Sequence, residues 1–338
     1  MSRYSIYKSY PKFLADTFRR YKNKSAEIKA MLQLNGTALV NRFVSSPLIP
    51  NHAKGVVFKI LYGEQVREST GNHAVFLSES DTERLLRGKY TLDTLPVDLF
   101  PYPAFTVCFP SSFEVHGKKL PGAQVSFVSD KTSFLENAED LLRKLPDAQF
   151  FSKGKAADVA YHENELTISY VDHGDEDHTF LTYRGDTLLQ VINSDNFKEF
   201  KKKTTSFTDR WLRAEKLDDK ELERQYVILR AVLGMCVYIK ARPQALQDGF
   251  PKARNFSLSE PFGVPTRSMN LNLGNVAPSK SSPNEHYRSW HIRQLSHERY
   301  YQNEHKDLAP GSRLVFVSDT MVNSTATVKN IENGRVTQ

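Results

Sequence analysis

The chain has 338 residues, a net charge of +7 and a pI near 9.1. Hydrophobic residues make up 39% and charged residues 25%, which is ordinary for a globular protein and excludes wholesale disorder. This length predicts two domains or one large domain. The positive charge favours acidic partners such as nucleic acid, although an excess of seven charges need not form one patch.

The two cysteines, Cys108 and Cys236, each lie in an apolar run, PAFTVCF and VLGMCVYI. This pattern is typical of buried thiols that act as small hydrophobic groups. Because the chain has neither a disulfide framework nor a C-x-x-C pair, we expect a cytoplasmic protein. The N-terminus lacks an apolar signal-peptide core, and the longest apolar stretch, residues 226–239, is too short to span a bilayer. We therefore expect no membrane partner.

The first predicted element is a helix over residues 11–34, where apolar residues recur at helical spacing. Pro11 suits the first turn of this helix and Gly36 suits its end. Residues 45–55 are predicted to form a loop, and residues 56–61 a short apolar element of undetermined type. A second helix is predicted over residues 80–87.

The signals then turn to β-structure. FTVCF and QVSFV read as short strands, with a turn at residues 120–122 between them. An amphipathic helix is predicted over residues 134–145. Residues 165–171 and 178–184 alternate with period two, which predicts a β-hairpin.

The tip of this hairpin, residues 172–178 (DHGDEDH), holds two histidines and four carboxylates. Such a group could bind a divalent metal. The spacing matches no EF-hand or zinc pattern, however, and Asp and Gly are ordinary turn residues. We predict a structural turn with no metal site.

The helix predicted after residue 218 is the clearest element of the chain. Asp218 and Glu221 form a capping pattern. Leu222, Tyr226 and Leu233 then recur at helical spacing. The apolar run is wide, so we expect a central buried helix.

The expected organisation is an α+β fold with a mixed helical and antiparallel β body. The body spans residues 1–245 and has peptide-binding potential. An irregular linker region follows over residues 246–285, then a basic segment with a strand at 313–317 over residues 286–323, and a polar tail over residues 324–338.

The sequence contains no Walker A motif, no strand-linked G-x-G-x-x-G, no G-x-S-x-G and no H-E-x-x-H. The large enzyme classes that these motifs mark are therefore not indicated. No cofactor is expected.

Four of the ten histidines fall within residues 286–305, among arginines and aromatic residues. Guanidinium groups bind phosphate, rings stack on bases, and imidazoles donate or move protons, so this mixture suits RNA. The alternative is an amphipathic surface segment whose aromatic rings pack on the core. The residues predicted to contact nucleic acid are Arg288, Trp290, His291, Arg293, Arg299, Tyr300, Tyr301 and Arg313.

One enzymatic alternative also stays open. Cleavage of RNA without metal needs a general base, a general acid and a cation near the phosphorane. His291, His297 and Arg293 are the catalytic candidates. In a helix the two histidines would lie on different faces, and in an irregular segment the sequence leaves their separation open. The basic run at Lys198 and residues 201–203 either extends an RNA footprint or forms a solvated face.

The C-terminal region resembles one known family. Residues 291–293 (HIR), 300–302 (YYQ) and Arg313, with a strand ending at residues 322–323 (VN), are similar to the C-terminal signature of the second type V-A anti-CRISPR family of phages and plasmids. Residues 259–262 (SEPF), 232–239 and 105–113 are looser echoes. Where the family has Gly-His-Trp, this chain has Leu295, Ser296 and His297, which puts any function of that turn in doubt.

The resemblance implies a binding protein from a mobile element. Such a protein recognises the nascent N-terminal region of a host defence nuclease and lowers the level of its mRNA and protein. The implied partners are that nascent polypeptide and its mRNA or ribosome, with His291, Arg293, Tyr300, Tyr301 and Arg313 as the functional face. From the residues alone, a metal-independent ribonuclease and an RNA- or DNA-binding regulator without a peptide partner remain the alternatives.

Overall fold

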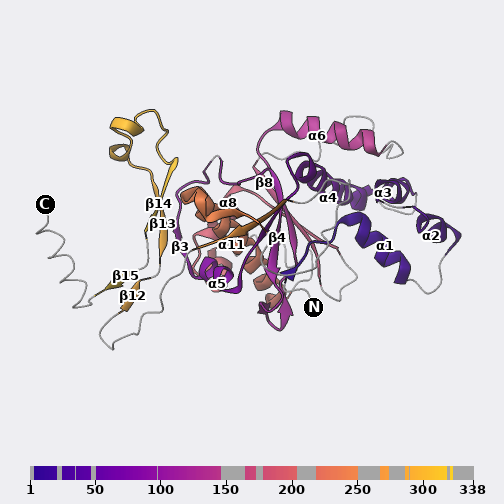
Figure 1. Ribbon diagram of the computed structural model, residues 1–338, viewed down its shortest axis with the longest axis horizontal. Coiled ribbons are helices and arrows are strands. Elements are labelled where there is room, and N and C mark those ends of the chain that lie inside the picture. The colour runs from indigo at the N-terminus through magenta and orange to yellow at the C-terminus, as the bar shows by residue number, and fades with distance from the viewer. Residues whose placement is uncertain are drawn as a thin grey trace, which may run out of the picture. The chain divides into compact units, whose positions relative to one another are not determined.

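The computed structural model describes residues 4–20, 25–34, 36–46, 51–96, 98–145, 164–172, 178–203, 218–249, 267–273, 286–288, 290–317 and 320–322. The fold is α+β, and Figure 1 shows its elements. The chain divides into two units. Unit 1 comprises residues 1–79, 100–185 and 246–271, and unit 2 comprises residues 80–99, 186–245 and 272–338. The units interleave along the sequence, whereas the sequence analysis placed all of residues 1–245 in one body.

Unit 1 is built on an eight-stranded mixed sheet in the order β10-β11-β2-β4-β7-β8-β9, with β1 paired to β4. Strands β11, β2 and β4 run parallel, and the remaining pairs are antiparallel. The predicted strands FTVCF and QVSFV are confirmed as β4 and β7, and the predicted hairpin as β8 and β9. The strands are β1 (Tyr4–Ser5), β2 (His73–Phe76), β4 (Ala104–Pro110), β7 (Ala123–Val128), β8 (Glu165–Val171), β9 (His178–Tyr183), β10 (Leu246–Asp248) and β11 (Arg267–Leu271).

The helices in the described part of unit 1 gather beside this sheet (Figure 1). They are α1 (Tyr10–Arg20), α2 (Ala26–Met31), α3 (Gly36–Ser45), α4 (Asn51–Ser69) and α6 (Lys131–Lys144). Their shared core includes Phe13, Leu39, Phe58, Leu61 and Leu141. The predicted helix at residues 134–145 is confirmed as α6, which begins earlier because Asp130 caps it by accepting the Ser133 N–H at 2.8 Å.

Three predictions for unit 1 are wrong. The single helix over residues 11–34 is two helices, because Ser25 accepts the Ile28 N–H and starts α2 afresh. Gly36 has φ 54° and opens α3 instead of ending a helix. Residues 51–55 belong to α4, where burial of the apolar residues that follow favours a helix over the predicted loop. A small hairpin, β5 (Glu114–Val115) with β6 (Lys118–Lys119), lies ahead of the predicted turn at residues 120–122.

Unit 2 is organised around α11 (Asp219–Ala241). Its N-cap is Asp218, which accepts the Glu221 N–H at 2.8 Å, and most of its residues are buried. The predicted central buried helix is therefore confirmed. The unit also contains helices α5 (Glu79–Arg87), which confirms the helix predicted at residues 80–87, α8 (Gly185–Ile192) and α9 (Phe197–Lys203).

Two small sheets complete unit 2. One has the order β14-β13-β3, from β14 (Arg313–Val317), β13 (His291–Leu295) and β3 (Lys89–Thr91). The other pairs β12 (His286–Arg288) with β15 (Thr320–Val322). The predicted strand at residues 313–317 is confirmed, and the region predicted to be irregular, residues 246–285, contains β10 and β11. Residues 275–284 and the tail after residue 322 lie outside the described residues.

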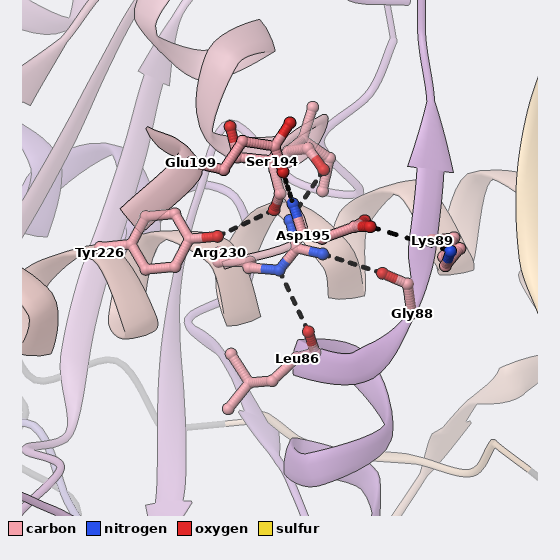
Figure 2. Close-up of polar contacts among 9 residues, drawn as sticks. Leu86, Gly88, Lys89, Ser194, Asp195, Glu199, Tyr226 and Arg230 are labelled. Carbon is pink, nitrogen blue, oxygen red and sulfur yellow. Dashed lines mark hydrogen bonds and ion pairs between the residues drawn. The ribbon is translucent and has the colours of Figure 1, made fainter. Parts of the chain in front are cut away.

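Arg230, in the middle of α11, joins the C-terminal ends of two other helices of unit 2 (Figure 2). Its side chain is 2% exposed and donates to four backbone carbonyl oxygens. Nε reaches Leu86 at 3.2 Å and Nη2 reaches Gly88 at 2.8 Å, while Nη1 reaches Val191 at 3.0 Å and Ile192 at 2.9 Å. These carbonyls close the C-terminal ends of α5 and α8, where the helix dipole is negative. A cation from α11 thus holds two helix ends.

Both cysteines are buried, as predicted. Within the described ranges, none of the helices is both long enough and apolar enough to cross a membrane.

Candidate nucleic-acid interface

The three-stranded sheet of unit 2 turns one set of side chains outward. His291 is paired with Lys89 on one side and Val317 on the other, and Arg293 is paired with Thr91. Because side chains alternate along a strand, all five lie on the same face of the sheet. Four of them are exposed and His291 is half-buried. These five residues, together with the half-buried Val315 that pairs with Arg293 on the same face, are called the open face below.

The opposite face of the same sheet is packed. Ile292 is 0% exposed and Trp290, at the start of β13, is 3% exposed. The Trp290 ring lies 5.6 Å from the Tyr238 ring of α11 and 5.8 Å from the Phe316 ring of β14. Aromatic contacts of this kind bury large apolar areas and fix strand orientation. They hold β13 and β14 against α11, so the open face has a rigid support.

Gln294 fixes the end of β13. Its Oε1 accepts the N–H groups of Asp93 at 2.8 Å and Thr94 at 3.1 Å, and its Nε2 donates to the Gly311 carbonyl at 2.6 Å. The side chain is 6% exposed. These bonds tie the segment after β3 and the segment before β14 to one residue. The sequence analysis missed Gln294, since a lone amide gives no signal of which backbone groups it will meet.

An arginine–tyrosine cluster connects the open face to the segment between β13 and β14: Arg293 comes from β13, Arg313 from β14, and Arg299 and Tyr300 from the segment between them. Arg293 Nη2 donates to the Tyr300 hydroxyl at 3.2 Å and Arg299 Nη2 donates to it at 2.5 Å. Both guanidinium groups also lie over the Tyr300 ring, at 6.0 and 4.6 Å from its centroid. Arg313 Nη1 donates to the Tyr300 carbonyl at 2.7 Å. Of the carboxylates in the described ranges, none forms an ion pair with these three arginines.

This cluster is electropositive. The hydrogen bond from Arg299, together with the nearby charges of Arg299 and Arg293, lowers the pKa of the Tyr300 hydroxyl below its usual value. Arg293 and Arg299 thus bring like charges together around a single acceptor, and none of the carboxylates that the structure describes is paired with them. A phosphate group would supply the missing negative charge and accept from the same guanidinium donors.

Two of the predicted stacking residues are in the core instead. Trp290 is buried as described above, and Tyr301 is 8% exposed. The Tyr301 hydroxyl donates to the Leu295 carbonyl at 2.5 Å and accepts the N–H groups of Gly311 at 2.7 Å and Arg313 at 3.1 Å. Neither ring can stack on a base in this structure. The predicted alternative, in which aromatic residues of this segment pack on the core, describes these two residues.

The remaining predicted residues fall in three places. His291 is on the open face, whereas His297 follows the end of β13, where its Nδ1 accepts the Arg299 N–H at 3.2 Å. The helical alternative for this pair does not apply, because His291 begins a strand and His297 caps a short 3₁₀ turn. Arg288 lies in β12, paired with Thr320.

The basic run of α9 borders a groove of about 860 Å³. Lys198, Lys201 and Lys202 line it together with two carboxylates, Asp219 and Glu223. Lys201 is paired with Asp219 at 2.6 Å, so part of the positive charge is already balanced. This neutralisation makes the groove a poorer phosphate site than the arginine–tyrosine cluster.

A group of three histidine, cysteine or acidic side chains able to hold a metal does not occur among the described residues. Residues 173–177 of the hairpin tip lie outside them.

A second polar feature, missed by the sequence analysis, is buried in unit 1. Helix α4 places Glu64, 0% exposed, and Arg67, 2% exposed, inside the unit. Burial raises the pKa of Glu64 to about 7. The sequence feature that could have indicated this buried pair is the run GEQVRES. It continues the apolar part of α4, but its own residues form no apolar stripe.

Comparison of the chain with protein-family models, with curated proteins and with solved structures finds no match.

Proposed function

We propose that this chain is an anti-CRISPR-like binding protein from a mobile element. It recognises the nascent N-terminal region of a host defence protein and lowers the level of that protein and its mRNA. In this proposal RNA lies on the open face and its phosphates contact the arginine–tyrosine cluster. The observation that supports RNA contact best is the gathering of Arg293, Arg299 and Arg313 around Tyr300, with no carboxylate partner among the residues that the structure describes.

The open face has the physical properties that single-stranded RNA requires. Arg293 supplies a cation on the exposed sheet surface, Lys89 beside it is paired with Asp195 at 3.8 Å, and Tyr300 supplies an aromatic ring that is not in the core. Phosphate contacts of this kind give most of the affinity and do not depend on sequence. Sequence choice would then come from the peptide partner, which brings the protein to one translating mRNA.

The peptide partner is proposed from the resemblance of residues 291–323 to the anti-CRISPR family. The fold is compatible with it, since β9 and β10 are the outermost strands of the eight-stranded sheet in the described part of the chain. An outer strand can accept an extended peptide as a further strand.

The test is affinity purification of the protein from cells, with the co-purifying polypeptides and RNA both sequenced. We expect a nascent chain together with its own mRNA. RNA enriched without a shared polypeptide would contradict the nascent-chain proposal and favour a regulator or a ribonuclease.

The variant that tests the RNA surface is Arg293→Ala combined with Arg299→Ala. Both side chains are exposed, so the fold should persist while RNA recovery and the lowering of target mRNA are lost. The matched control is Arg87→Ala combined with Arg143→Ala, which removes the same charge from two exposed helix positions. Equal knock-down by both double variants would rule out this surface.

A further inference from the structure

Three of the largest fully buried side chains are arginines, and their partners differ. Arg230 donates to four carbonyl oxygens, and Arg224 donates to both carboxylate oxygens of Glu221 at 3.2 Å. Arg67 is as deeply buried as these two, at 2% exposed. Its Nε and Nη2 have no acceptor on any residue that the structure describes. The Nε of Arg224 also lacks an acceptor among the described residues, but Arg224 reaches a carboxylate through Nη1, whereas Arg67 has two donor nitrogens without an acceptor there.

The surroundings of Arg67 are polar and enclosed. The Tyr7 ring covers the guanidinium, with Cζ 5.4 Å from the ring centroid. Glu64 lies one helical turn earlier on α4. Its Oε1 accepts the Tyr7 hydroxyl and the Tyr10 N–H, both at 2.7 Å. Its Oε2 is buried and has no hydrogen-bond partner in the described part of the chain.

A buried guanidinium without acceptors is costly. An unsatisfied buried donor costs about 1–3 kcal/mol and more when the group is charged. The Nε and Nη2 hydrogens point the same way, in the geometry that matches the two oxygens of a carboxylate or phosphate. The group that best completes this edge is therefore a small oxyanion.

We propose that Arg67 binds a small oxyanion of the carboxylate or phosphate class through its Nε–Nη2 edge, with a protonated Glu64 donating from Oε2 to the same anion. Tyr7 closes the site from the N-terminal segment. This site lies in unit 1 and does not depend on the RNA contact proposed for unit 2.

The binding should be linked to one proton on Glu64. The titratable groups near Glu64 are Arg67 and Glu68 on α4, Tyr7 and Tyr10 before and in α1, Cys108 on β4 and His178 on β9. Burial raises the pKa values of Tyr7, Tyr10 and Cys108 and lowers the pKa of His178 to about 3, so these groups stay neutral near pH 7. Because burial raises the pKa of Glu64 to about 7, its proton is lost above that pH.

The experiment is calorimetric titration of the full chain with formate, acetate and inorganic phosphate, separately, at pH 6 and pH 8. We expect binding at pH 6 and an affinity about tenfold weaker for each pH unit above 7. Binding of formate or acetate alone identifies the carboxylate class, and binding of phosphate alone identifies the phosphate class. Absence of binding by all three at pH 6 would overturn the proposal.

Two variants identify the residues. Arg67→Met should abolish binding, whereas Arg87→Met, at an exposed arginine, should leave it unchanged. Glu64→Gln keeps a donor in the same place, so it should bind formate or acetate, which stay fully ionised over this range, with no change between pH 6 and pH 8. If Glu64→Gln keeps the wild-type pH dependence, the role proposed for Glu64 is wrong. This measurement stays informative even if Arg67→Met does not fold.

Discussion

At the scale of single residues, the hydrogen-bond acceptors around a buried arginine determine its role in this chain. Arg230 lies at the C-terminal ends of α5 and α8 and satisfies four carbonyl oxygens there. Its guanidinium also lies 5.3 Å from the Tyr90 ring centroid. Because its donors are directed at carbonyls and not at a carboxylate, its role is to join helices, and it is not a candidate for catalysis.

Replacing Arg230 tests this role. Arg230→Met keeps much of the side-chain volume but leaves buried carbonyls without a donor. We expect the free energy of unfolding to fall by about 3–5 kcal/mol. Urea denaturation followed by circular dichroism measures the change. Arg87→Met, at an exposed position, should stay within about 0.5 kcal/mol of wild type, and a similar value for Arg230→Met would show that the carbonyl contacts contribute little.

Glu64 predicts a pH dependence of stability. Its pKa is raised from 4.5 to about 7, so the folded state holds the proton more tightly than the unfolded state does. The resulting stabilisation is complete below pH 4.5 and is lost as the pH rises to about 7, by an amount of about 3 kcal/mol at most.

The Glu64→Gln variant has no titrating group at this position. The unfolding free energy of the wild type, measured relative to that of the variant, should therefore fall as the pH rises over this range. Denaturation from pH 5 to pH 8, in amine buffers with chloride as the counter-ion, measures it. The lowered pKa of His178 acts on both proteins and cancels in the difference. A difference that is constant with pH would contradict the prediction.

At the scale of elements, α11 is the clearest case of agreement between sequence and structure. The Asp218 cap and the wide apolar run predicted a central buried helix, and 16 of its residues are buried. Its packing was not predictable. A Cβ at Gly234 would clash with the Tyr90 hydroxyl of β3, whose bond to the Leu85 carbonyl is 2.9 Å long. The glycine thus permits close approach of β3 to α11.

Gly234→Ala should therefore destabilise the protein, although alanine is the better helix former. We expect a loss of about 1–3 kcal/mol from overpacking. Adding Tyr90→Phe removes the clashing hydroxyl, so the double variant should be less destabilised than the sum of the two single variants. A double-mutant cycle by urea denaturation checks this, and strict additivity would mean that the two residues do not interact.

The elements that sequence reasoning predicted share a physical property. The strands β4 and β7, the hairpin β8–β9 and the helices α6 and α11 have local periodicity or caps that agree with their burial. The wrong predictions fall where local sequence signals conflict with the packing of the folded chain. Ser25 and Gly36 divide the predicted N-terminal helix, and α4 carries polar residues into the interior where a stripe pattern would place apolar ones.

At the scale of the whole molecule, each unit is assembled from segments far apart in the sequence. β13, near the C-terminus, pairs with β3, about 200 residues earlier, through His291 opposite Lys89. Trp290 and Ile292, before and within β13, contribute buried side chains to unit 2. A boundary at residue 285 therefore cuts through unit 2 and does not separate a tail from a body.

Truncation after residue 285 tests this arrangement. The shortened chain would expose the apolar surface of α11 and leave β3 without its partner, so we expect loss of cooperative unfolding in unit 2 and aggregation. Truncation after residue 322 serves as the control, because it keeps β12 to β15. Limited proteolysis and thermal denaturation compare the two. Equal stability of both chains would contradict the assignment of β13 to the core of unit 2.

The sequence by itself determined the α+β class, the buried cysteines, the capped central helix and the concentration of arginine near the C-terminus, because each depends on composition or on neighbours along the chain. Only the tertiary structure decided that Trp290 and Tyr301 are buried while Arg293 and Arg299 converge on Tyr300. It also decided that Glu64 and Arg67 are enclosed and that Arg230 finds four carbonyls. The reason is that burial and partners depend on strand register and on contacts between distant segments, which local sequence patterns do not specify.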